Sequence, residues 1–74
     1  MKVETQDFYL SAYLQTQGIN IVEMKNFGTR KLFVYEDNAE FQELKKKYYW
    51  NEAKVNPMDY KKSIRELKGL IMNK

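Results

Sequence analysis

The chain has 74 residues and a formal net charge of +3, and it contains neither cysteine nor histidine. This length fits one domain, and the missing residue types exclude disulfides, thiolate or imidazole metal ligands and a histidine general base. Mixed charges with an ordinary apolar content predict a folded protein, and no stretch resembles a signal peptide or a membrane span, so we expect a cytoplasmic protein with no membrane partner.

The first predicted element is a helix over about residues 6–17. Thr5 is its expected N-cap. Apolar side chains cover more than half of the helix circumference, which predicts a nearly enclosed helix with Ser11 and Gln15 on its narrow solvent side. Gly18 then provides the left-handed residue that ends the helix.

Residues 19–35 predict a two-stranded antiparallel hairpin. Its strands, INIVEMK and TRKLFVY, are rich in β-branched and aromatic residues and flank a short turn at Gly28. Both faces of this ribbon carry apolar residues, so we expect cover on both sides, from helices or from a partner subunit. Lys25, Arg30 and Lys31 surround the turn, and a basic ribbon can enter a major groove, but nearby acidic residues dilute this signal.

Two more helices are expected, over about residues 38–49 and 57–72. Asp37 is the expected N-cap of the first, and Asn56 is the expected N-cap of the second. The predicted order is therefore α-β-β-α-α. The fold class is α+β, a single small domain over residues 1–74 in which one two-stranded hairpin packs with three helices.

Three segments carry a family resemblance: TQDFYLSAYL, FVYED and KVNPMDYKKSIRELKGLI. In this combination the chain is similar to a family of short uncharacterised proteins, a domain of unknown function, from bacteria, phages and mobile elements. The likeness extends over nearly the whole chain. It implies a small stand-alone domain carried by mobile elements, and it assigns no catalytic or binding residue.

The residue types of an active site are scarce. Ser11 and Ser63 are the only serines, no histidine can activate them, and the three glycines are too scattered for a phosphate loop. Glu36 and Asp37 are adjacent carboxylates, but Asp37 is assigned to a helix cap. We therefore expect no enzymatic activity, no cofactor, no metal site and no small-molecule substrate.

The run KKKYYW, at residues 45–50, contains the first group of candidate binding residues. On a helical wheel Tyr48 joins the apolar stripe, Lys46 and Lys47 face solvent, and Trp50 points away from the stripe. Burial of Trp50 beneath the following loop is the favoured interpretation, because exposed large rings are uncommon. The alternative is an exposed Trp50 that stacks on unpaired bases.

A second basic group lies on the last predicted helix. Lys61, Arg65 and Lys68 recur at i, i+4 and i+7, away from the apolar stripe. Such a ridge is the footprint expected of phosphate contacts, although the outer face of any surface helix also favours lysine. The positive excess lies entirely in residues 38–74, which contain nine basic and five acidic groups.

Two functions remain open. The first is a non-enzymatic nucleic-acid-binding accessory protein, in which basic side chains contact phosphates and Trp50 stacks on a base. Its candidate phosphate contacts are Lys46, Lys47, Lys61, Arg65 and Lys68. The second is a protein-interaction module, either a homodimer that pairs open hairpin edges or an inhibitor of a host protein. The charge asymmetry and the tryptophan outside the stripe favour the first.

Overall fold

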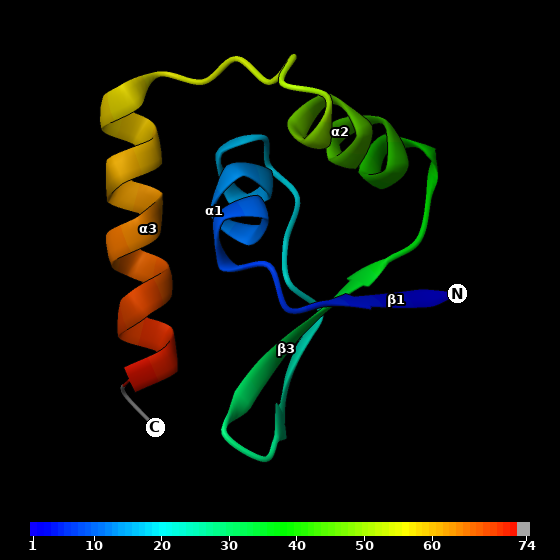
Figure 1. Ribbon diagram of the computed structural model, residues 1–74, viewed down its shortest axis with the longest axis vertical. Coiled ribbons are helices and arrows are strands. Elements are labelled where there is room, and N and C mark those ends of the chain that lie inside the picture. Colours follow the sequence, from blue (N-terminus) through cyan, green and yellow to red (C-terminus); the bar gives the residue numbers. More distant parts are fainter. Residues whose placement is uncertain (73–74) are drawn as a thin grey trace.

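The computed structural model describes residues 1–72, apart from the side chain of Phe27. The elements follow in the order β1 (Lys2–Thr5), α1 (Phe8–Thr16), β2 (Glu23–Phe27), β3 (Arg30–Glu36), α2 (Ala39–Tyr49) and α3 (Pro57–Met72). Helix α1 lies between α2 and α3, and the strands run along one side of this group of helices (Figure 1). The predicted α+β class with three helices is confirmed.

The sheet has three antiparallel strands in the order β1-β3-β2, so the expected two-stranded hairpin is wrong in this respect. The missed strand β1 pairs with the second half of β3, with Val3 opposite Tyr35. Only four residues long, β1 has a single strongly apolar side chain, which leaves little hydrophobic pattern to detect. Val3 and Thr5 are nevertheless half-buried and alternate with exposed charges, the period-two pattern of a strand. The topology is β-α-β-β-α-α.

The two faces of the sheet are covered in different ways. Phe33 and Tyr35 of β3 are buried in the core beneath the helices, whereas Val34 between them points to the opposite face and is buried as well. On that outer face an ion pair joins Lys25 of β2 to Glu4 of β1, with Nζ and Oε2 2.8 Å apart. Charged side chains from both edge strands, with their aliphatic stems, therefore cover Val34.

Helix α1 is the most enclosed helix, as its apolar circumference predicts. Its N-cap is Asp7 and not Thr5: Asp7 Oδ1 accepts the backbone N–H of the third helical residue at 3.0 Å, while Thr5 belongs to β1. Ser11 was expected on the solvent side, but it is buried because it lies against the Tyr35 hydroxyl of β3. Gly18 ends the helix as predicted, with φ at +86°.

Local capping sets the starts of the other two helices. Asn38, and not the expected Asp37, is the N-cap of α2, because its Oδ1 accepts the Phe41 N–H at 2.8 Å. Asn56 caps α3 as predicted and accepts the Met58 N–H at 2.8 Å. Asp37 and Asn38 are adjacent and can both cap a helix, and in the structure Asn38 occupies the capping position.

The seam between α1 and α3 fixes the orientation of α3. Leu67 is fully buried in it, and the Ser63 hydroxyl donates to the Ala12 carbonyl at 2.8 Å. The Tyr60 hydroxyl donates to the Tyr9 carbonyl at 3.1 Å. Because these contacts occupy one side of α3, its basic side chains face solvent.

Candidate nucleic-acid interface

The C-terminal turn of α2 presents Trp50 to solvent, with 70% of the residue exposed. A Schellman motif ends the helix here: the Glu52 N–H donates to the Lys47 carbonyl at 2.8 Å, and the Asn51 N–H to the Tyr48 carbonyl at 3.3 Å. Asn51 takes the left-handed conformation of this motif, with φ at +62°. The motif fixes the backbone at Trp50 and leaves the ring outside the core, so the favoured interpretation of a buried Trp50 is wrong.

Tyr49 ties the same turn to the start of α1. Its hydroxyl donates to Asp7 Oδ2 at 2.6 Å, while Oδ1 of the same carboxylate caps α1. Partial burial, followed by this hydrogen bond to Asp7, raises the pKa of Tyr49 to about 12. Tyr48 packs against Tyr13 of α1 with ring centroids 5.8 Å apart. The backbone that bears Trp50 is therefore held from two sides.

Lys46 and Lys47 occupy the last turn of α2 and are exposed. Cations are favourable at this position because the helix dipole is negative there. The ion pairs within residues 1–72 all lie at the sheet, so neither lysine forms an ion pair with a carboxylate in this range. Lys45 differs from its neighbours: its ammonium lies over the Phe41 ring, 6.0 Å from the centroid, and is directed back toward the core.

Lys61, Arg65 and Lys68 lie along one exposed side of α3. A shallow surface hollow is lined by Lys61 and Arg65 together with Lys62 and Met58. No ion pair involves these basic residues in the part of the chain that the structure describes. Since they stand on one face without neutralising partners, they form a continuous positive strip.

The six predicted binding residues thus form two groups. The α2 group comprises Lys46, Lys47 and Trp50, and the α3 group comprises Lys61, Arg65 and Lys68. The two helices lie on opposite sides of α1, so the structure does not merge the groups into one patch (Figure 1). The segment 50–56 connects the C-terminus of α2 to the N-terminus of α3, so these two helix ends lie toward the same end of the molecule, and the α3 group extends away from there along α3 (Figure 1).

A family model described as a domain of unknown function, DUF5659, matches residues 2–73. The chain belongs to this family. The resemblance of the three sequence segments is confirmed at that level, and DUF5659 brings with it no assigned role for any residue. No curated protein and no solved structure matches the chain.

Sequence reasoning missed two side chains that belong to this region of the DUF5659 domain. Asp7 holds Tyr49, but its importance depends on a contact between residues 42 positions apart, which no local pattern reveals. Tyr9 is 54% exposed on α1, although the apolar run around it suggests an enclosed position. An aromatic residue in a run of apolar residues gives no local signal of which side remains uncovered.

Within residues 1–72, the features that a metal site and a membrane-spanning helix require are absent. Within residues 1–72, no group of three or more carboxylate, histidine or cysteine side chains could hold a metal ion. In that range no helix has both the length and the apolar character needed to cross a bilayer.

Proposed function

We propose that this protein is a small non-enzymatic nucleic-acid-binding protein of the cytoplasm that prefers single-stranded chains. One observation carries this proposal: the exposed Trp50 stands beside two unneutralised lysines on a helix end with a fixed backbone. An aromatic face stacks on any unpaired base, and each such contact is worth about 1–3 kcal/mol. Under this proposal Lys46 and Lys47 contact the phosphates next to that base.

Tyr49 supports the preference for unpaired bases. The residue is 54% exposed, and its ring stands edge-on to Tyr48 with centroids 5.2 Å apart. The hydrogen bond to Asp7 restricts its rotation, so under this proposal a second unpaired base meets a ring that is already ordered. Stacking of this kind requires bases that are free of a partner strand, which a duplex does not offer.

The α3 group extends the same proposal. Its three cations lie on the side of α3 opposite to the seam with α1, without an aromatic side chain among them. Under this proposal they contact phosphates farther along the strand and add affinity that does not depend on sequence. Their contribution appears in the salt dependence of binding. The logarithm of the affinity falls with the logarithm of the salt concentration, with a slope of about 0.7 for each single-stranded phosphate neutralised.

Fluorescence anisotropy with a labelled oligothymidylate tests the proposal. We expect tighter binding to the single strand than to its duplex with oligoadenylate, and weaker binding as salt increases. The double variant Lys46→Ala/Lys47→Ala should weaken binding, while Lys2→Ala, a lysine paired with Glu36 at the sheet, serves as the matched control. No binding to either oligonucleotide at low salt would contradict the proposal.

A second candidate function, protein–protein interaction, is favoured by exposed apolar side chains near the start of β2. The exposed fractions of Val22 and Leu70 are 48% and 57%. Contact with water is unfavourable for apolar side chains, and such exposed groups can mark a surface that binds another protein. Under this candidate the protein binds a second copy of itself or, if it comes from a phage or mobile element as the resemblance implies, inhibits a host protein. Binding to oligonucleotides that is lost when the α2 group is replaced by alanine favours the first function over this one.

A further inference from the structure

Strand β2 forms one edge of the sheet, and its outer main-chain groups have no partner strand within residues 1–72. The Val22 N–H donates to the Val34 carbonyl at 2.7 Å, so the main-chain groups of Val34 point toward β2. Glu23 pairs with Val34, so the main-chain N–H and carbonyl of Glu23 are directed toward β3. Because antiparallel strands alternate, the main-chain groups of Met24 and Asn26 point outward, away from β3.

The charges along this edge are self-complementary. Glu23 and Lys25 flank Met24 and lie on the outer face of the sheet. When two copies align antiparallel about a twofold axis at Met24, Glu23 of one faces Lys25 of the partner subunit, and the symmetry repeats this pair. Side chains directly opposite each other on adjacent strands are close enough to attract. The outward N–H and carbonyl of Met24 then bond to Met24 of the partner subunit.

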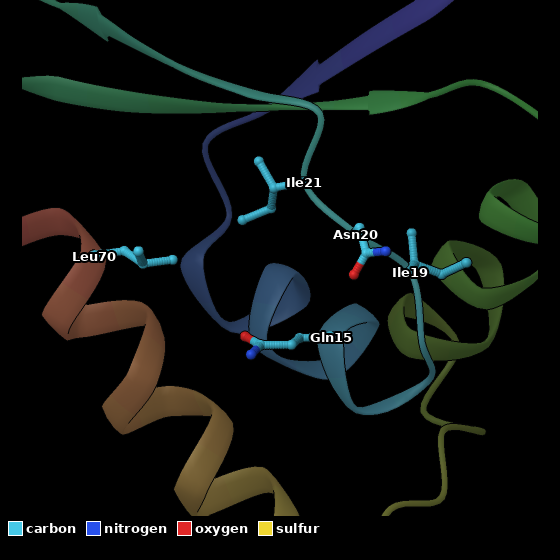
Figure 2. Close-up of a pocket in the computed structure, with 5 residues that line it drawn as sticks. All are labelled: Gln15, Ile19, Asn20, Ile21 and Leu70. Atoms are coloured by element: carbon cyan, nitrogen blue, oxygen red, sulfur yellow. The ribbon is translucent and has the colours of Figure 1, made fainter.

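An apolar pocket of about 350 Å³ lies next to this edge. It opens beneath the start of β2, between α1 and the last turns of α3 (Figure 2). Apolar side chains reach it from two elements, with Ile21 directed below the sheet and Leu70 directed toward it from α3 (Figure 2). Its lining residues are Gln15, Ile19, Asn20, Ile21 and Leu70.

The same register brings the partner's hairpin turn near this pocket. With Met24 opposite its own copy, the turn at residues 28 and 29 extends beyond the start of β2 in the partner subunit, where residues 19–21 leave the sheet (Figure 2). The turn of each subunit therefore runs past the pocket of the other. Burial of this apolar lining adds a favourable free energy to the main-chain hydrogen bonds and ion pairs of the edge.

We propose that the protein forms a twofold dimer in which two β2 strands pair antiparallel at Met24 and join the two sheets. The interface is isologous, because the same edge, charges and pocket are used by both copies. This inference stands independently of nucleic-acid binding, since the α2 group and the α3 group lie on helices and not on this edge.

A charge exchange between copies tests the register. Glu23→Lys puts two lysines opposite each other in a homodimer, and Lys25→Glu puts two glutamates there. We expect each variant alone to raise the dissociation constant of the dimer roughly tenfold or more, because attraction becomes repulsion at both symmetry-related pairs. An equimolar mixture of the two variants restores complementary charges and should dimerise like the wild type. Sedimentation velocity over a concentration series measures all four samples.

Two controls keep the outcome unambiguous. The double variant Glu23→Lys/Lys25→Glu exchanges the charges within one chain, so it should dimerise with itself. Lys25→Glu also breaks the exposed ion pair with Glu4, and circular dichroism checks that the fold remains. A monomeric wild type overturns the proposal, as does a dimer that neither single variant weakens or a mixture that fails to restore association.

Discussion

The C-terminal turn of α2 and the exposed side of α3 carry similar charge but differ in what accompanies it. At the end of α2, unneutralised lysines stand beside Trp50 and the half-exposed Tyr49. On α3, the cations of the α3 group stand beside Met58 and no exposed aromatic ring. Charge therefore identifies a surface suited to phosphate on both helices, whereas only the end of α2 adds an aromatic ring on which an unpaired base can stack.

The two helices also differ in how they are held against α1. Helix α3 is held by buried apolar contacts along a seam that includes Leu67. The end of α2 is held by aromatic packing and by the hydrogen bond from Tyr49 to Asp7 near the surface. Substitutions on α3 should therefore act mainly on stability when they reach the seam, whereas those of the α2 group should act mainly on binding.

The largest effect is expected in the seam. Leu67→Ala removes a fully buried side chain and should lower the free energy of unfolding by about 2–5 kcal/mol. Met58→Ala on the same helix removes an exposed side chain and should change it by less than about 0.5 kcal/mol. Urea denaturation followed by circular dichroism measures both. Equal effects of the two substitutions would show that α3 is not anchored through Leu67.

Trp50→Ala should produce the next largest effect, and on binding alone. Loss of one stacked base costs about 1–3 kcal/mol, or roughly 5- to 150-fold in affinity for a single strand. The free energy of unfolding should stay within about 0.5 kcal/mol of the wild type because the ring is exposed. Trp50→Phe retains an aromatic face and should recover part of the affinity. An unchanged affinity for Trp50→Ala would remove the distinction between the two helices.

Replacing the basic residues of the α2 group and of the α3 group in separate variants measures how many phosphate contacts each helix contributes. Lys46→Ala/Lys47→Ala and Lys61→Ala/Arg65→Ala/Lys68→Ala should each reduce the slope of log affinity against log salt by about 0.7 for each phosphate that is no longer neutralised. Anisotropy titrations at several salt concentrations give these slopes. If the α3 triple variant keeps the full slope, the strand binds only at the end of α2, and the extended path along α3 is contradicted.

The smallest effect is expected from Tyr49→Phe, which deletes the hydrogen bond to Asp7 and should cost about 1 kcal/mol or less because the group is half exposed. Its pH dependence has a defined sign. The pKa of Tyr49 is raised from 10.0 to about 12 by partial burial and by Asp7, so the unfolded chain loses this proton first as pH rises.

Stability from this group is therefore fully present below pH 10 and is lost between pH 10 and about 12. Partial burial also raises the pKa of Tyr60 to about 12, so Tyr60 contributes in the same window. Urea midpoints measured across this range should fall less steeply in Tyr49→Phe than in the wild type. An identical pH profile would show that the Asp7 hydrogen bond does not form in solution.

The sequence was sufficient to predict the start or end of a helix where only one nearby residue could take the capping role. Gly18 takes the left-handed conformation that ends α1, and Asn56 caps α3, as predicted. The other two caps were displaced by one or two residues because a suitable neighbour stood nearby. At α1, the expected cap Thr5 was already part of β1, whose pairing with β3 depends on residues about 30 positions away.

The exposure of Trp50 could not be decided from periodicity, because the residue stands where the helix ends. Its environment depends on how the chain leaves the helix, and Asn51 closes a Schellman motif in the left-handed conformation that leaves the Trp50 ring outside the core. Asparagine tolerates that conformation better than most residues, so the pair Trp50-Asn51 did contain a usable signal. The hydrogen bond between Tyr49 and Asp7 had none, because it joins distant segments.

The emission of Trp50, the single tryptophan of the chain, reports whether its ring stacks on a base. An unlabelled oligothymidylate is added to the wild-type protein at low and at moderate salt while the indole emission is recorded. Stacking predicts saturable quenching that weakens with salt and that is reduced in the Lys46→Ala/Lys47→Ala variant. An emission spectrum that does not change at low salt, up to oligonucleotide concentrations well above that of the protein, would contradict the account.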